Sequence, residues 1–150
     1  MIDFSKLEFD DATEERLFEF CRTHRLGLAD SYLSPKDFKF HVTVMYSKVT
    51  NPNFPEGDRD FAPQDLRAEC FDMFGPENNL LALRLQRSEA LLSLFDHYLS
   101  TYGHVSEFMP YRPHITIRGC APDVAKRIGS IPLPDFDLRA VRLVHKVKLA

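Results

Sequence analysis

The sequence predicts an α+β fold in which two similar halves, about residues 1–65 and 66–150, make one domain of 150 residues. In each half an amphipathic helix precedes a proline-containing loop and then a short strand with alternating apolar and polar residues. The strand histidines, His41 and His114, are 114 − 41 = 73 positions apart, about half of the chain. Such a repeat predicts two pseudo-symmetric sheet-plus-helix lobes around a central cleft.

The first half begins with a helix that Asp11 is expected to cap and Gly27 to end. Its apolar stripe contains Leu17, Phe18, Phe20 and Cys21. After a loop, apolar and polar side chains alternate over residues 38–45, which predicts a strand with one buried and one polar face. The polar face carries His41 and Thr43.

The second half repeats this order. Ser88 is the expected cap of its helix and Gly103 the expected end, so the two caps are 88 − 11 = 77 positions apart. The apolar stripe contains Leu91, Leu92, Leu94, Phe95, Tyr98, Leu99 and Tyr102. A loop with two prolines leads into a strand at 114–117, whose polar face carries His114 and Thr116.

Three more strands are predicted from apolar runs and turn residues. Residues 66–74 and 80–85 are expected to pair through a turn at 75–79, and residues 138–149 to close the sheet. The stretch 50–63 is rich in proline and is expected to be a surface loop.

The composition, 44% hydrophobic and 27% charged, is ordinary for a globular chain. A net charge of −3 argues against a long nucleic acid as the partner, whereas a small phosphorylated ligand needs only a few local donors. Three widely spaced cysteines indicate neither a disulfide framework nor a metal site. Because no signal pattern or membrane-length apolar run is present, we expect a cytoplasmic protein that does not contact membranes and has no obligate protein partner.

The two His-x-Thr elements are the main functional signal. Residues i and i+2 of a strand point to the same side, so each element presents an imidazole beside a hydroxyl. Cleavage of a phosphodiester needs a base, an acid and donors to the non-bridging oxygens. His41 and His114 supply the acid–base pair in either assignment, and Thr43 and Thr116 supply the donors. Two rings related by pseudo-twofold symmetry would flank the phosphorus, as in-line displacement requires.

One such element alone carries little information, since chance predicts 6 × 6/150 = 0.24 of them from six His and six Thr. A polar residue on a solvated strand face is then the alternative, and the matched place in both halves argues against it. The other histidines are expected at the surface or at helix ends: His24, His97 and His104. The role of His145 stays open.

Substrate contacts are sought around these strands. Arg118 is in phase with the second His-x-Thr element and is a candidate phosphate contact, with a solvated strand-end arginine as the alternative. Phe74, beside the predicted turn, is a candidate stacking platform for a base, and Phe9 is a second. Tyr46 and Lys48 are out of phase with the His41 face, so only a β-bulge or a strand end would turn them inward.

Metal-dependent hydrolysis and a nucleophilic serine or cysteine are the competing mechanisms. The sequence lacks His-Glu-x-x-His, Cys-x-x-Cys and dense carboxylate spacing, and threonine is a poor zinc ligand. It also lacks a Gly-x-Ser-x-Gly nucleophile elbow. We therefore predict catalysis without a metal or another cofactor.

A strand at 80–85, a leucine-rich helix and then Tyr-Arg-Pro-His-Ile-Thr at 111–116 follow one another in the second half. With the element at His41, this order resembles the 2H phosphoesterase superfamily, which has two His-x-Thr/Ser motifs on a bilobal, LigT-like α+β fold. The resemblance implies that His41 and His114 are the acid–base pair and that Thr43 and Thr116 bind phosphate.

Within that superfamily, the short two-lobe plan and the segment at 40–47 are most similar to the phage anti-CBASS nucleases. Those enzymes degrade cyclic di- and trinucleotide signals of bacterial antiviral defence. The resemblance implies a small cyclic oligonucleotide substrate in the host cytoplasm, with attack by a ribose 2′-hydroxyl on the neighbouring 3′-phosphate. Two alternatives stay open: an enzyme acting on RNA ends, such as a 2′,3′-cyclic phosphate or 2′,5′-RNA phosphodiesterase, and a sponge that binds cyclic nucleotides without cutting them.

Overall fold

A computed structural model describes residues 1–26, 38–75, 77, 79–106, 109–117 and 123–149. Within this part of the chain, eight strands form one sheet. The strands, in chain order, are β1 (Ile2–Phe9), β2 (His41–Ser47), β3 (Gly57–Arg59), β4 (Gln64–Leu66), β5 (Ala68–Phe74), β6 (Leu80–Leu85), β7 (His114–Ile117) and β8 (Leu138–Lys148). The helices are α1 (Asp11–Thr23), α3 (Glu89–Tyr102) and α4 (Val124–Arg127), followed by a 3-10 turn at Ile128–Ser130. The predicted α+β class is confirmed.

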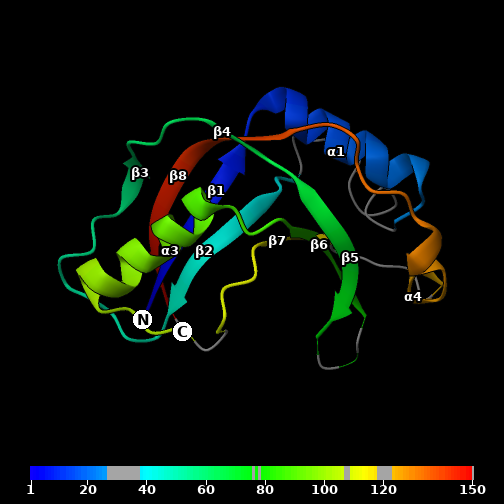
Figure 1. Cartoon of the computed structure of the whole chain (residues 1–150). Helices are drawn as coiled ribbons and strands as arrows, with labels where there is room; N and C mark the ends of the chain where they lie inside the picture. The colour runs from blue at the N-terminus through cyan, green and yellow to red at the C-terminus, as the bar shows by residue number, and fades with distance from the viewer. Residues whose placement is uncertain (27–37, 76, 78, 107–108, 118–122, 150) are drawn as a thin grey trace.

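The strands of both halves pair in the antiparallel order β3-β8-β1-β2-β7-β6-β5, and β4 also pairs with β8. β2 and β7, which carry the two His-x-Thr elements, are neighbours near the middle of this order (Figure 1). The two halves therefore meet within one sheet. Their arrangement as two lobes around a cleft stays a prediction.

The predicted repeat has a counterpart in this topology. β1, α1 and β2 follow one another in the first half, and β6, α3 and β7 follow one another in the second. In both units the strand before the helix pairs antiparallel with the strand after it. Each His-x-Thr element opens the strand that follows the helix.

The second helix has the predicted limits. The Ser88 hydroxyl accepts a hydrogen bond from the N–H of Leu91 at 3.2 Å, as an N-cap does. Gly103 ends the helix with a φ of 65°, a left-handed conformation that glycine adopts without steric cost. The predicted hairpin of β5 and β6 and the closing strand β8 are also present.

The first helix begins one residue earlier than predicted, because Asp10 and not Asp11 is its cap. The Asp10 carboxylate accepts from the N–H of Thr13 at 2.8 Å, whereas Asp11 lies in the first turn. Two adjacent aspartates offer the same capping chemistry, and the chain leaving β1 selects the earlier one. The helix ends at Thr23; Gly27, its predicted end, lies outside the described residues.

Two strand predictions need correction. The expected surface loop at 50–63 contains β3, in which Gly57 pairs with His145 of β8. The strand expected at 38–45 begins only at His41 and continues to Ser47. In both places the pairing partner, which local periodicity does not reveal, decides where the strand lies.

β1 is the main element that the sequence analysis missed. One face of this strand carries Ile2, Phe4, Lys6 and Glu8, and the other carries Asp3, Ser5, Leu7 and Phe9. Each face is therefore part apolar and part polar, so the alternation that marks a half-buried strand is absent. The strand nevertheless lies between β8 and β2 and is buried over most of its length.

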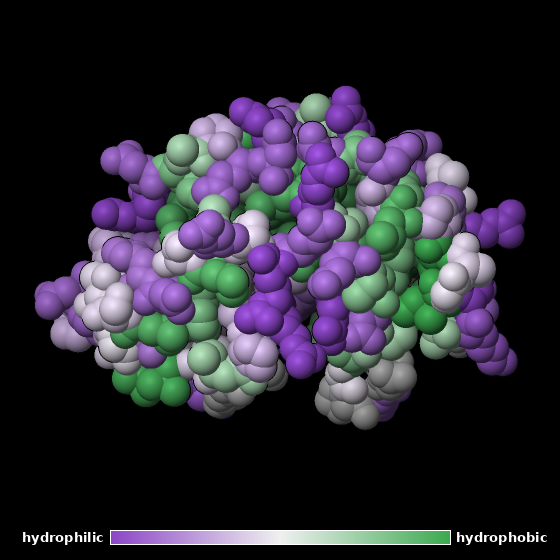
Figure 2. Space-filling view, viewed as in Figure 1, coloured by the Kyte–Doolittle hydropathy of each residue, from purple (hydrophilic) through white to green (hydrophobic). Residues whose placement is uncertain are grey.

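α1 and α3 pack on the same face of the sheet. Phe20 of α1 stacks on Phe71 of β5, with ring centroids 6.2 Å apart. Tyr98 of α3 is hydrogen-bonded through its hydroxyl to His145 of β8 at 2.6 Å. Figure 2, in the same orientation as Figure 1, shows a mostly hydrophilic surface with small hydrophobic patches. None of the described helices is both long and apolar enough to cross a membrane.

Under α3 the core contains a buried polar pair. His104, expected at the surface or at a helix end, follows α3 but is buried, and its Nε2 lies 2.8 Å from Oδ2 of Asp3. The same carboxylate oxygen accepts from the N–H of Asn51 at 2.8 Å. His145 is also buried on this face, so neither histidine shares a face with the His-x-Thr elements.

Glu14 of α1 is buried where the chain enters β2. Both of its carboxylate oxygens lie 3.1 Å from the N–H of Phe40, the residue before His41. Burial raises the pKa of Glu14 to about 7 despite this hydrogen bond. Between pH 4.5 and about 7, the folded protein therefore keeps a proton on Glu14 that the unfolded chain has lost. As the pH rises through this range, the free energy of unfolding falls, because deprotonation favours the unfolded chain.

We expect Glu14→Gln to remove this pH dependence, because glutamine stays neutral and still accepts from Phe40. Relative to the wild type, the variant should gain about 2–3 kcal/mol in free energy of unfolding between pH 4.5 and pH 8. Urea unfolding at a series of pH values measures the difference, with the exposed neighbour Glu15→Gln as control. Parallel stability curves for wild type and Glu14→Gln would contradict this role.

Candidate active site

The two His-x-Thr elements lie side by side because their middle residues pair across the sheet. Val42 of β2 is the register partner of Ile115 of β7, and both side chains are fully buried in the core. In both strands burial alternates, so the histidine and threonine on either side of the middle residue point to the opposite face. That face is the one that α1 and α3 leave uncovered.

The antiparallel register also determines how the four side chains face one another. One residue to either side of the Val42–Ile115 pair, His41 lies opposite Thr116 and His114 lies opposite Thr43. The two histidines are therefore on a diagonal, each beside the threonine of the other element. This is a local twofold arrangement, which is what the sequence repeat predicted for these four residues.

β1 and β6 add charged neighbours to the same face. Glu8 is the cross-strand partner of His41, and Lys6 is the partner of Thr43. On the other side, Arg84 is the partner of His114. Lys6 Nζ lies 3.0 Å from a carboxylate oxygen of Glu8, so a lysine and its counterion lie against the first His-x-Thr element. Lys6 is not predicted at the site from the sequence, because the pattern of β1 does not predict a strand.

Glu8 is held as a carboxylate. Burial by itself raises the pKa of Glu8, but hydrogen bonds from Arg142 and Lys6 outweigh it and hold that pKa below its usual value. Arg142 Nε donates to Oε1 of Glu8 at 2.7 Å. The Glu8 charge is therefore balanced by two cations.

His41 is neutral in this environment. Burial lowers its pKa to about 4, and the positive charges of Lys6 and Lys148 add to the effect. A neutral imidazole has a free lone pair and can take up a proton. A phosphate anion bound nearby would raise this pKa toward its ordinary value, since an opposite charge favours the protonated ring.

His114 is oriented by the backbone. Its Nδ1 lies 3.0 Å from the carbonyl oxygen of Arg112, which accepts the Nδ1–H and leaves Nε2 as the nitrogen available to a ligand. Tyr111, the residue before Arg112, is buried and stacks on Phe95, with ring centroids 4.6 Å apart. Its hydroxyl donates a hydrogen bond to the carbonyl of Thr43 at 2.8 Å. This contact joins the loop before β7 to β2.

A β-bulge in β2 brings Tyr46 to the His41 face. Ser5 pairs with Met45 and Lys6 with Thr43, so β2 has one extra residue between these pairs. Such a bulge is the condition under which the sequence pattern predicts that Tyr46 turns inward, and this condition is met. Tyr46 is 41% exposed and contacts Phe4 edge to face at 6.0 Å between centroids.

The aromatic candidates have different positions. The Phe74 ring lies 5.6 Å from the His114 ring, so the hairpin of β5 and β6 brings it to the second His-x-Thr element. Phe9 is buried in the hydrophobic core, so its proposed role in stacking on a base is corrected. Phe9 lies on the same face of β1 as Leu7, which is the face that packs into the core. Arg118 lies outside the described residues.

Two lysines of β8 lie on the same face of the sheet as His41. Lys148 Nζ lies 3.9 Å from the centroid of the Phe4 ring, a cation–π contact, and Phe4 in turn lies 6.1 Å from the His41 ring. Lys146, the cross-strand partner of Phe4, is on the same face. Although the chain has a net charge of −3, the face that carries both histidines therefore gathers lysine and arginine side chains. It combines proton-transfer groups, hydroxyl donors and positive charge, which suits a phosphate ester.

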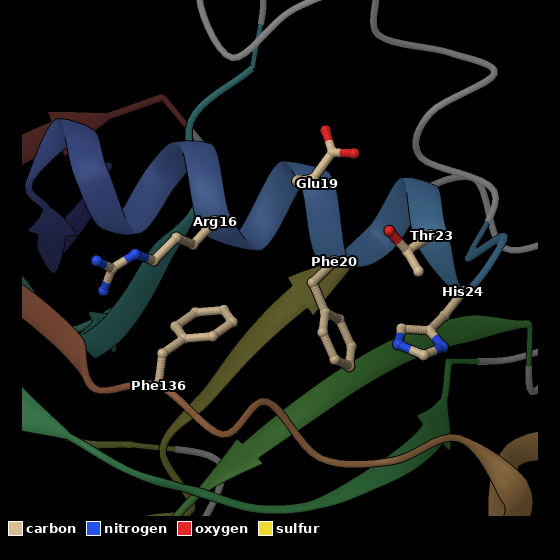
Figure 3. Close-up of a pocket in the computed structure, with 6 residues that line it drawn as sticks. All are labelled: Arg16, Glu19, Phe20, Thr23, His24 and Phe136. Carbon is tan, nitrogen blue, oxygen red and sulfur yellow. The ribbon is translucent and has the colours of Figure 1, made fainter.

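A groove of about 270 Å³ lies elsewhere, between α1 and the segment before β8 (Figure 3). Figure 3 shows Phe20 and His24 extending from α1 on the side of Phe136, while Arg16 lies near the Phe136 ring. This groove is on the helix-covered face and contains none of the four His-x-Thr residues. Among the described residues, no group of three His, Cys, Asp or Glu is arranged to hold a metal ion, and the absence of a metal from the reaction stays a prediction.

A known protein family matches most of the chain. The family model described as Anti-CBASS protein Acb1 matches residues 4–126, which is 126 − 4 + 1 = 123 of 150 residues. The matched range includes both His-x-Thr elements as well as β1 and β6. A search of curated proteins finds no match.

Proposed function

Since the chain belongs to the Acb1 family of anti-CBASS proteins, we propose that it is a phosphodiesterase that cleaves the cyclic di- and trinucleotide messengers of CBASS. Cleavage of these messengers would remove the signal that activates the bacterial defence and allow a phage to evade it. The observation that carries the proposal is the pairing of Val42 with Ile115, which sets two imidazoles and two hydroxyls together on one face.

We assign His41 as the base and His114 as the acid. His41, whose pKa is lowered, removes the proton of a ribose 2′-hydroxyl; the 2′-oxygen forms a bond to the adjacent phosphorus, and the bond from phosphorus to the 5′-oxygen breaks. The protonated His114 gives its Nε2 proton to the departing 5′-oxygen. The products are a 2′,3′-cyclic phosphate and a 5′-hydroxyl, and proton exchange with water restores both rings.

The threonines and the nearby cations bind the phosphate in this proposal. Thr43 and Thr116 donate to the non-bridging oxygens, whose negative charge grows as the bond to phosphorus forms. Lys6, beside Thr43, adds a positive charge to the same side. Phe74, whose ring lies 5.6 Å from the His114 ring, and Tyr46, an exposed ring on the His41 face, are proposed to stack on bases.

The two strand–helix–strand units also support membership of the 2H phosphoesterase superfamily. Each unit ends in a strand that opens with His-x-Thr, and the two strands pair about a local twofold. We propose that the chain has the bilobal 2H fold, with the β2–β7 pair as the join between its lobes.

The test is to incubate the protein with a chelator and a panel of cyclic dinucleotides, cyclic trinucleotides and short linear RNAs, and to identify the products by mass spectrometry. We expect cyclic oligonucleotides to be opened with the chelator present. Loss of activity on chelation would sink the metal-free mechanism. Preference for linear RNA would favour an enzyme of RNA ends, and binding without turnover would favour a sponge.

The assignment of His41 as base predicts that substitution of Lys6 changes the pH dependence of kcat/KM. The rate constant kcat/KM should fall as the pH drops through about 4, where the free enzyme protonates His41. Lys6→Met removes one of the charges that disfavour the imidazolium, so the pKa of His41 rises and the acidic limb moves to higher pH. We also expect kcat/KM at neutral pH to fall about tenfold through the lost attraction for phosphate. The control is Lys126→Met, which removes an exposed lysine of α4. If the acidic limb of the kcat/KM profile of Lys6→Met lay at the same pH as in the wild type, the assignment of His41 as base would be wrong.

A further inference from the structure

A second pocket, of about 280 Å³, lies beside His114 at the end of β6. Three arginines line it, Arg84, Arg87 and Arg112, together with Glu69. We call it the arginine pocket. None of the reaction steps proposed above uses it.

Two contacts join the arginine pocket to the candidate active site. Arg84 is the cross-strand partner of His114, and such partners have Cβ atoms about 4.5–5.5 Å apart. Arg112 supplies the carbonyl oxygen that accepts the Nδ1–H of His114. A ligand with one group between the two histidines is therefore within reach of the pocket through another group.

The arginine pocket has an excess of positive charge. The Arg84 guanidinium lies 2.5 Å from a carboxylate oxygen of Asp72, so this charge is partly balanced. In the described part of the chain, Arg87 and Arg112 form no ion pair within 4.0 Å. Both residues are exposed, and Glu69 is the one acidic residue among those that line the pocket. Guanidinium groups that are not neutralised bind phosphate oxygens through paired hydrogen bonds.

We propose that the arginine pocket binds a second phosphodiester of the cyclic substrate while the first is cleaved between His41 and His114. This inference rests on the proposed function and specifies which part of the substrate the arginine pocket recognises. A cyclic oligonucleotide has at least two phosphodiesters, whereas a dinucleoside monophosphate has one. Recognition of the second phosphate would let a small acidic protein favour the cyclic messenger over short linear RNA.

The test compares cyclic diadenylate with the linear dinucleoside monophosphate ApA. Arg87→Ala should raise the KM for cyclic diadenylate about tenfold with little change in kcat, because a charge-assisted hydrogen bond to the uncleaved phosphate is lost. The kcat/KM for ApA should stay within about twofold. Arg87→Lys should recover part of the loss. Arg139→Ala is the matched control, because it removes an exposed arginine of β8, outside the pocket.

Equal losses on both substrates, or no loss on either, would overturn the proposal. Inorganic phosphate is the probe for another source of the anion: if it inhibits the wild type but not Arg87→Ala, while the KM for cyclic diadenylate is the same in both, the pocket binds free phosphate instead.

A binding measurement separates this inference from the proposed function. Calorimetric titration of cyclic diadenylate into His41→Ala and into His41→Ala/Arg87→Ala does not depend on turnover. If the wild type does not cleave cyclic diadenylate but Arg87→Ala still weakens binding about tenfold, the proposed function is wrong and the binding role of the arginine pocket is supported. If the wild type cleaves cyclic diadenylate and Arg87→Ala does not weaken binding, only the proposed role of the arginine pocket is wrong.

Discussion

Alanine at His41 or at His114 is expected to lower kcat on a cyclic dinucleotide by about 10²–10⁴-fold, the range for loss of one general acid or base. In the proposed mechanism both rings transfer protons in the same step, so the double variant should be little slower than either single variant. Initial rates from chromatography of the products measure the effect.

His97→Ala is the matched control for both variants. His97 is exposed on α3, on the helix-covered side of the sheet, and its Nδ1 lies 3.1 Å from the hydroxyl of Thr101. It should keep wild-type activity, and circular dichroism should show that the two single variants, the double variant and the control are all folded. Retention of most activity in His41→Ala, with His114→Ala inactive, would leave no role for the first element as the base.

Valine at Thr43 or at Thr116 has the second largest expected effect. Valine keeps the shape of threonine and removes the hydroxyl, so the variant loses one donor to the developing charge on phosphate, which is worth about 10²–10³-fold in kcat. The loss should appear in kcat rather than in KM, because the donated hydrogen bond strengthens in the transition state.

Serine at the same positions tests whether the hydroxyl is the group that matters. Thr43→Ser and Thr116→Ser keep the donor and should keep activity within about tenfold of the wild type. Thr101→Val, at an exposed position of α3, is the control for the substitution itself. If the serine variants were as slow as the valine variants, packing rather than hydrogen bonding would explain the loss.

The sequence alone was sufficient for much of this site. The period of two around His41 and His114 predicted two strands with one polar face, and β2 and β7 carry those residues at alternating positions. The cap at Ser88 and the end at Gly103 were predicted because helix termini depend on side chains within a few residues. Phe74 was placed beside a turn and its ring contacts His114.

The charged surroundings of the site could not be predicted in this way. Lys6 and Glu8 lie on a strand with mixed faces, and only pairing with β2 and β8 places them beside His41. The bulge that turns Tyr46 inward is a property of two paired strands, because it requires one strand to have a residue more than the other. Phe9, a predicted candidate for stacking on a base, is a core residue because β1 is part of the sheet.

The sequence by itself therefore determined which residues alternate, where the second helix starts and ends, and that two His-x-Thr elements occupy equivalent places in a repeat. Only the tertiary structure decided that Val42 pairs with Ile115. This pairing brings together the two His-x-Thr elements, whose histidines are 73 positions apart in the sequence. The physical reason is the range of the interactions. Side-chain period and capping are set by neighbours along the chain, whereas strand order and register depend on burying both faces of the whole sheet at once.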